Sequence, residues 1–182
     1  MKRAACWMVL ALLTGCATRM ETHVDHDVAQ VFTAYHTYAW LGDDPQLNAG
    51  RSDYRVSPLN RRRVIDAVEA QLASKGFVKA PDRASADFVV AYTIGARDKL
   101  DVTTFPVPYN GGWGWGRRYF GPEVDAQSYV EGTLAIDIFD RRSHRPVWHG
   151  WARKRVTEED REHAAEQIDV AAKTILSSFP PR

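Results

Sequence analysis

The chain has 182 residues, 45% hydrophobic and 26% charged, a balance typical of a single globular domain. The formal net charge is +1, and removal of residues 1–15 leaves 22 of the 24 Lys and Arg against 23 Asp and Glu. This near-neutral body excludes the strong electrostatic attraction on which nucleic-acid binding depends, so we expect no nucleic-acid partner.

The first 16 residues, MKRAACWMVLALLTGC, predict a bacterial lipoprotein leader at residues 1–15. Lys2 and Arg3 form a positive start, and the ten apolar residues after them suit a signal peptide. A membrane-spanning helix would need about 20 apolar residues. The sequence LTGC at residues 13–16 resembles a lipobox, which implies cleavage between Gly15 and Cys16 and attachment of diacylglycerol to the Cys16 thiol.

Cys6, the only other cysteine, lies inside the leader, so the mature domain can form neither a disulfide nor a cysteine-based zinc site. Two or three acyl chains at Cys16 would hold the protein durably at a membrane, because one chain anchors only marginally. Ala17 follows Cys16, and the absence of Asp there favours the outer membrane facing the periplasm in a Gram-negative host. The alternative is a secreted protein with a chance cysteine.

Residues 16–28 are expected to be the lipidated cysteine and a polar tether that passes into an edge strand. His23, Asp25, His26 and Asp27 alternate in a way that invites a metal ion, but no second cluster of ligands supports such a site. We therefore expect a solvated segment here, no metal or other cofactor, and a single folded domain over residues 29–180.

The first half of that domain predicts a strand, a helix and further strands. Residues 31–41 (VFTAYHTYAWL) favour a strand, and residues 46–56 a loop. Ser57 and Pro58 begin a helix with an apolar stripe, and Gly76 ends it. Phe77 and Val78 begin a short strand, and residues 87–94 (DFVVAYTI) form a buried one. Glycine, proline and aromatic residues predict a long loop over residues 95–127.

Residues 129–139 and 147–156 predict an antiparallel hairpin, because apolar and polar side chains alternate in both. The requirement for one apolar face selects a single register with charge-compatible polar pairs. After the hairpin, TEED at residues 157–160 resembles a capping box that begins an amphipathic helix ending at Pro180. The predicted cross-strand pairs are Ile138 with Trp148, Leu134 with Ala152, Val130 with Val156, Glu131 with Arg155, and Asp137 with His149.

The order of elements predicts an α+β fold, an antiparallel or mixed β-sheet with two α-helices packed on one face and a long Gly/Trp-rich loop. Over residues 20–180 the chain resembles the bacterial lipoprotein family called domain of unknown function 4136. The resemblance implies a periplasm-facing lipoprotein domain and no assigned reaction. It is carried by FTAYHTYAWL, LASKGF, ADFVVAYTI, the Gly/Trp-rich segment, YVEGTLAIDIFD, RPVWHGWA and ILSSFPP, with EGTL and WHG the most specific.

The chain lacks the GxSxG, HExxH, P-loop and dinucleotide-binding motifs. Asp137 and His149, predicted cross-strand neighbours, would suit an orienting acid and a base, with Ser128 or Ser143 as nucleophile. Neither serine lies on a sharp elbow, however. An envelope hydrolase is therefore the alternative function, and a half-exposed polar pair is the simpler interpretation.

The Gly/Trp-rich segment supplies the candidate contact residues. Its rings could stack on the sugars of a glycan, lie at a lipid interface, or cover an apolar sheet edge. Its arginines would suit anionic phosphate groups. We therefore favour a membrane-anchored, non-enzymatic module that binds an envelope protein, glycan or lipid. The contact residues are Trp113, Trp115, Arg117, Arg118, Tyr119 and Phe120.

Overall fold

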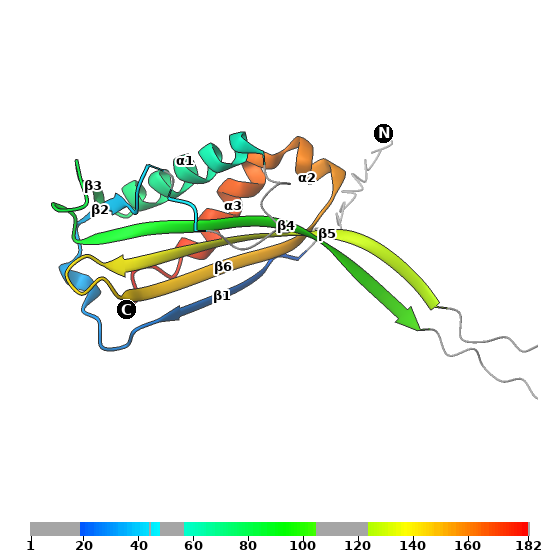
Figure 1. The fold of residues 1–182 in the computed structure, drawn as a ribbon, viewed down its shortest axis with the longest axis horizontal. Helices are drawn as coiled ribbons and strands as arrows, with labels where there is room; N and C mark the ends of the chain where they lie inside the picture. The colour runs from blue at the N-terminus through cyan, green and yellow to red at the C-terminus, as the bar shows by residue number, and fades with distance from the viewer. Residues whose placement is uncertain (1–18, 44, 48–56, 105–123, 182) are drawn as a thin grey trace, which may run out of the picture.

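The computed structural model describes residues 19–43, 45–47, 57–104 and 124–181. Across these ranges the chain forms a six-stranded, open mixed sheet with three α-helices packed on it (Figure 1). The predicted α+β fold is thus confirmed. The strands are β1 (Glu21–His26), β2 (Thr37–Trp40), β3 (Val78–Lys79), β4 (Phe88–Thr104), β5 (Val124–Asp140) and β6 (Pro146–Val156), and the helices are α1 (Pro58–Ser74), α2 (Glu158–Glu162) and α3 (Ala164–Leu176).

The strands lie in the order β1-β6-β5-β4-β2-β3. The neighbouring strands β1, β6, β5 and β4 pair antiparallel in that order, whereas β2 pairs parallel with both β3 and β4. The parallel pairs follow from the connection, because α1 carries the chain from β2 back along the sheet before β3 begins. The sheet begins at Glu21, inside the range expected for the tether, and β1 is the edge strand expected there.

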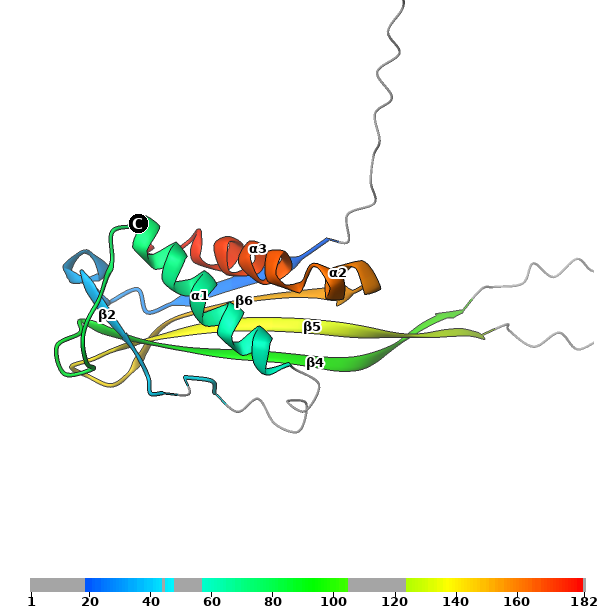
Figure 2. The same ribbon diagram turned by 90° about the horizontal axis from the view of Figure 1, so that it is seen from above.

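The β5–β6 register agrees with the sequence prediction at all five pairs, including Leu134 with Ala152 and Asp137 with His149. Even-numbered residues of β4, β5 and β6 face the helices and carry most of the buried sheet side chains. The helices α1 and α3 run side by side over this face (Figure 2). Phe179, just after α3, packs in the same layer with its ring 5.4 Å from that of Trp148 and 5.5 Å from that of Phe88.

Both predicted helix starts have the expected caps. The Ser57 hydroxyl accepts a 3.2 Å hydrogen bond from the Leu59 N–H, and Gly76 follows α1 with a φ of +89°, which favours glycine. Thr157 and Asp160 exchange the two hydrogen bonds of a capping box at α2. The predicted C-terminal helix is divided at His163, so the helical layer contains α2 and α3 where one helix was expected.

Two stretches differ from the sequence prediction. Within residues 31–41 the strand covers only Thr37–Trp40, because Phe32–Ala34 form a 3-10 helix that buries Phe32. Residues 95–104 and 124–127, expected in a loop, extend β4 and β5 instead. Residues 124–129 of β5 pair only with β4 among the described strands, and the two strands form a ribbon that projects past the helices (Figures 1 and 2). Pairing between two strands uses backbone groups that every residue type carries, so the hydrophobic pattern did not reveal the ribbon.

Candidate functional site

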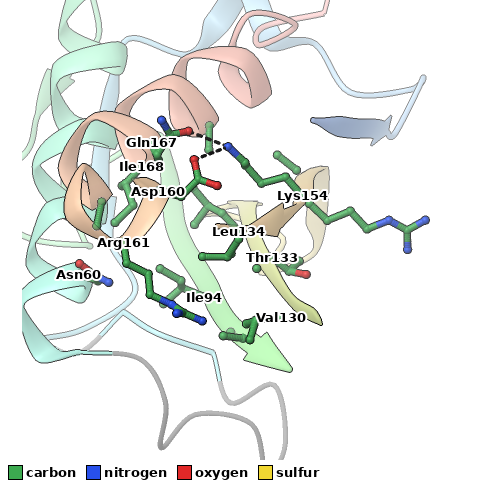
Figure 3. A pocket seen from close by; sticks show the side chains of 18 of the residues that line it. Asn60, Ile94, Val130, Thr133, Leu134, Lys154, Asp160, Arg161, Gln167 and Ile168 are labelled. Carbon is green, nitrogen blue, oxygen red and sulfur yellow. Dashed lines mark hydrogen bonds and ion pairs between the residues drawn. The ribbon is translucent and has the colours of Figure 1, made fainter. Parts of the chain in front are cut away.

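A cavity of about 400 Å³ lies between the helices and the sheet, at the end from which the β4–β5 ribbon projects (Figure 3). This volume falls within the range of about 300–1,000 Å³ that is usual for small-molecule sites. Its floor comes from β4, β5 and β6, and its roof from the first turns of α1, α2 and α3. Six elements that are distant in sequence from one another, or separated by turns, thus meet at one site.

The floor of the cavity has larger apolar side chains at both ends and small residues between them. Ile94 and Leu134 are paired across β4 and β5 at the inner end, and Val130 lies at the outer end. Ala96 and Gly132 form the pair between them. These two residues contribute almost no side-chain volume, and the Val156 side chain of β6 lies over Gly132, with its Cγ2 only 2.8 Å from where a Cβ of residue 132 would stand. The floor at this point is therefore formed by Ala96 and Val156. On the roof, α3 adds Ala164, Ile168 and Ala171.

A hydrogen-bonded network lies at the boundary between floor and roof. Lys154 Nζ donates to Asp160 Oδ1 at 2.8 Å and to Gln167 Oε1 at 3.0 Å (Figure 3). The Lys154 and Asp160 side chains are only 16% and 12% exposed, so this ion pair is largely shielded from water. Burial raises the pKa of Asp160, but the hydrogen bonds from Lys154 and Thr157 outweigh it and hold that pKa below its usual value. Asp160 is therefore ionised near neutral pH, with the Lys154 ammonium group beside it.

The remaining rim is basic. Arg161 pairs with Glu158 on α2, and Arg153 pairs with Glu21 at 2.8 Å. Arg63 is different, because its Nη1 donates to the amide oxygen of Asn60 at 2.7 Å. No ion pair joins Arg63 to a carboxylate in the described part of the chain. The rim thus keeps one positive charge that no described acidic side chain neutralises, beside an apolar hollow.

The described lining of the cavity offers apolar surface, a hydrogen-bonded Lys154–Asp160 pair and a cationic edge. Within the described ranges no group of three or more His, Cys, Asp or Glu is placed to hold a metal ion. His23, Asp25 and His26 of the predicted tether lie along β1.

Asp137 and His149 lie on the other face of the sheet, away from the helices. Their side chains meet as predicted, with Oδ1 and Nδ1 2.7 Å apart, and are 18% and 43% exposed. Neither residue lines the cavity. Ser128 is exposed at a position nine residues earlier on β5, about 30 Å away at the strand rise of about 3.3 Å per residue. Ser143 lies in the β5–β6 turn, where its N–H binds Asp140. The structure therefore brings Asp137 and His149 together but places neither Ser128 nor Ser143 beside them.

The other predicted site residues lie outside the described residues. These are Gly15 and Cys16 of the lipobox and the contact residues Trp113, Trp115, Arg117, Arg118, Tyr119 and Phe120. The cavity itself was missed by sequence reasoning. Two weak signals pointed to it: glycine at position 132 interrupts an alternating strand, and Arg63 lies near the helix N-terminus, where the dipole disfavours a cation.

The comparisons with known proteins agree with this fold. The family described as "Domain of unknown function (DUF4136)" matches residues 21–181. A DUF4136 family protein from Bacteroides thetaiotaomicron has a similar structure, with a TM-score of 0.55 and 14% identity, over 88% of this chain and 96% of that one. PelC from Paraburkholderia phytofirmans, solved as a dodecamer, gives a TM-score of 0.51 and 11% identity, over 90% of this chain and 99% of PelC.

A PDZ domain protein from Parabacteroides distasonis gives a TM-score of 0.52 and 13% identity over 91% of this chain. Only 37% of that longer protein is covered, so the likeness concerns one part of it. At such low identities these likenesses show the fold alone. No curated protein matches the sequence. No helix in the part of the chain that the structure describes is long and apolar enough to cross a membrane.

Proposed function

The chain belongs to the DUF4136 family, and we propose that it is a lipid-anchored, non-enzymatic binding module of the bacterial envelope. The observation that carries this proposal is the leader MKRAACWMVLALLTGC, with its lipobox-like ending at Cys16. Residue Glu21, at the start of β1, follows only five positions later. A lipid on Cys16 would therefore hold the folded domain close to the membrane surface.

The proposed location is the outer membrane, with the domain facing the periplasm, because Ala17 rather than Asp follows the lipidated cysteine. The partner is an envelope protein, glycan or lipid, and no cofactor is required. Two surfaces support a binding role. The cavity offers an apolar hollow with a cationic rim, and the β4–β5 ribbon leads toward the segment that contains Trp113 and Trp115.

A binding role is preferred to hydrolysis because of what surrounds the two candidate sites. The described lining of the cavity contains no histidine that could act as a general base. The Lys154 and Asp160 side chains near its roof are already hydrogen-bonded to each other. The Asp137–His149 pair lies on a sheet face with neither Ser128 nor Ser143 hydrogen-bonded to His149 in the described structure. Hydrolysis by the Asp137–His149 pair would require a nucleophile held within hydrogen-bonding distance of the base.

The anchor is tested by fractionation and mass spectrometry of cells that express the full chain. Wild type should enter the membrane fraction with acyl chains on an N-terminal Cys16, because several chains anchor durably. Cys16→Ser should lose this modification and retain the leader. Cys6→Ser is the matched control, since that thiol lies within the leader and should have no effect. An unmodified Cys16 thiol in the wild-type protein would refute the anchor.

The contact segment is tested separately. Replacing Trp113 and Trp115 with Ala should weaken retention on purified envelope fractions, because both proposed contact rings are removed. Replacing the same residues with Phe keeps aromatic rings and should preserve most of the binding. Equal retention of wild type and the double Ala variant would exclude these two residues as the contact.

A further inference from the structure

We propose that the cavity beside Gly132 and Arg63 holds an acyl chain of an anionic membrane lipid, with the lipid headgroup at the basic rim; this rests on the proposed anchoring, which brings the cavity to a membrane. The proposal adds a ligand class and a site to that function. It depends on three independent observations, namely the apolar lining, the charge of the rim, and the place of the cavity relative to Cys16.

The lining matches a hydrocarbon chain. Between the Ile94–Leu134 pair and Val130, β4 and β5 contribute only Ala96 and Gly132, and the Val156 side chain of β6 covers Gly132. The floor on which an elongated apolar ligand could lie is therefore aliphatic. The roof above it is also apolar along α3. A cavity of this size that combines apolar surface with polar side chains is typical of small-molecule sites. Its apolar wall comprises Ile94, Ala96, Val130, Leu134, Ala152, Val156, Ala164, Ile168 and Ala171.

The rim selects the sign of the headgroup. Lys154 and Asp160 neutralise each other, as do Arg161 and Glu158. Arg63 binds only the neutral amide of Asn60 among the described residues. Its guanidinium retains donors that match phosphate or carboxylate oxygens. The uncompensated charge at the mouth is therefore positive, which favours an anionic headgroup over a neutral one.

The position of the cavity favours a lipid as the source of the ligand. Met20, immediately before β1, lines the cavity. Cys16 lies four residues earlier, so even a fully extended chain of about 3.6 Å per residue separates them by no more than about 14 Å. An anchored protein would thus keep the cavity within a short distance of the bilayer surface. The acyl chains on Cys16 itself are the competing source, but their glyceryl group carries no charge for Arg63 to bind.

The experiment uses the full chain in living cells that are fed a long-chain fatty acid with a photoactivatable group and an alkyne handle. Cells incorporate this probe into phospholipids and into lipoproteins. Label that forms without illumination reports acylation at Cys16 and therefore tests the anchor. Label that needs illumination, mapped by mass spectrometry to peptides of β4, β5 and α3 that line the cavity, reports its occupant.

The first pair of variants tests whether the label depends on the free volume of the cavity. Ala164 lines the roof, whereas Ala165 is exposed on the same turn of α3. Ala164→Leu should fill part of the cavity and lower its light-dependent label by at least about fivefold, as expected when an apolar pocket loses room for several methylenes. Ala165→Leu should leave the label unchanged. Circular dichroism of both purified variants checks that the fold is kept. Equal labelling of Ala164→Leu and wild type would overturn the proposal.

A second pair tests the headgroup. Arg63 lines the cavity, whereas its neighbour Arg62 points to solvent and pairs with Asp66 at 3.1 Å. Arg63→Gln should lower the light-dependent cavity label by about twofold to fivefold, the range for one partly exposed ionic contact, and Arg62→Gln should not. Equal labelling of these two variants would overturn the assignment of an anionic headgroup.

Cys16→Ser separates this inference from the proposed anchoring. It should abolish the light-independent label and keep the cavity label, because the bound lipid is not attached to the chain. Loss of both labels together would identify the protein's own acyl chains as the occupant and overturn the proposal of a separate lipid. Cavity labelling in a wild-type protein that shows no light-independent label would instead refute the anchor and leave the lipid site supported.

Discussion

Tyr35 and Asp140, 105 positions apart in the chain, are joined by a 2.9 Å hydrogen bond from the phenol to carboxylate Oδ2. Asp140 also accepts the N–H groups of Arg142 and Ser143, so one carboxylate closes the β5–β6 turn and fixes the segment before β2. Burial raises the pKa of Asp140, but the hydrogen bonds outweigh it and leave that pKa below its usual value. Burial and Asp140 raise the pKa of Tyr35 far above its usual value. A neutral donor thus meets an ionised acceptor at neutral pH.

We expect Tyr35→Phe to lower the free energy of unfolding by about 1.5–3 kcal/mol, the usual contribution of a hydrogen bond to a charged group. The ring contacts with Phe32 and Phe88 remain in this variant, so the loss comes from the hydroxyl alone. Urea denaturation measures the difference. Tyr129→Phe is the control, because its ring still packs under Arg155 and its change should stay within about 0.5 kcal/mol. Equal losses in the two variants would contradict the role of the Tyr35–Asp140 bond.

The stability of the domain should fall in acid. The pKa values of Asp87, Glu131, Asp140 and Asp160 are all lowered, because hydrogen bonds to their ionised forms outweigh the effect of burial. Their folded pKa values lie below the ordinary values of 3.8 for Asp and 4.5 for Glu. The stabilisation is thus complete above those ordinary values and is lost as pH falls through the folded values.

Urea denaturation at a series of pH values tests this dependence, and the free energy of unfolding should decline progressively below the ordinary carboxyl pKa values. Asp87 receives the N–H groups of His36 and Thr37 and the Thr37 hydroxyl. Asp87→Asn removes one titrating group and should make the acid-side decline shallower. A stability that rises on acidification, or a slope that Asp87→Asn leaves unchanged, would show that these carboxylates are not the cause.

Local signals were sufficient for much of the fold. Ser57, Gly76 and Thr157 act through groups within a few residues, so their caps were readable from sequence. The β5–β6 register followed from alternation, because a shift by one residue would turn Leu134 outward. The 3-10 helix at Phe32 was not readable in this way. It depends on packing of Phe32 against Phe179, at the far end of the chain.

The two candidate sites also differ in whether local sequence patterns or tertiary packing bring their residues together. Asp137 and His149 were placed together correctly because one hairpin register determines their separation. The cavity instead depends on Arg63 of α1, Ala96 of β4 and Ala164 of α3, which tertiary packing alone brings together. Nothing in the spacing of these residues along the chain predicts a common site. Sequence patterns therefore found a cross-strand pair and missed the hollow between sheet and helices.

The capping box at α2 offers a test on the cavity roof. The Thr157 hydroxyl accepts the Asp160 N–H at 3.2 Å, and Asp160 also binds Lys154. Thr157→Ala should lower the free energy of unfolding by about 1 kcal/mol, the usual effect of losing a helix N-cap. Thr174→Ala is the control, because this exposed threonine lies inside α3 and its hydroxyl donates a hydrogen bond to the Val170 carbonyl of the same helix. A loss at Thr174 as large as that at Thr157 would argue against the cap.

Gly150 is the position at which β6 and α3 leave no room for a side chain. A Cβ there would collide with the Trp148 ring and lie 2.7 Å from Ile175 Cγ2. Trp148 and Ile175 are both fully buried, so neither can move aside without disturbing the core. Gly150→Ala should therefore destabilise the protein by about 1–3 kcal/mol, the usual cost of overpacking.

Gly95→Ala, on β4, is the matched control, because its Cβ would meet no atom within 4 Å and its backbone needs no positive φ. Thermal and urea unfolding of the two variants provide the comparison, and a Gly150→Ala protein as stable as the Gly95→Ala one would show that α3 does not pack on the sheet as closely as described.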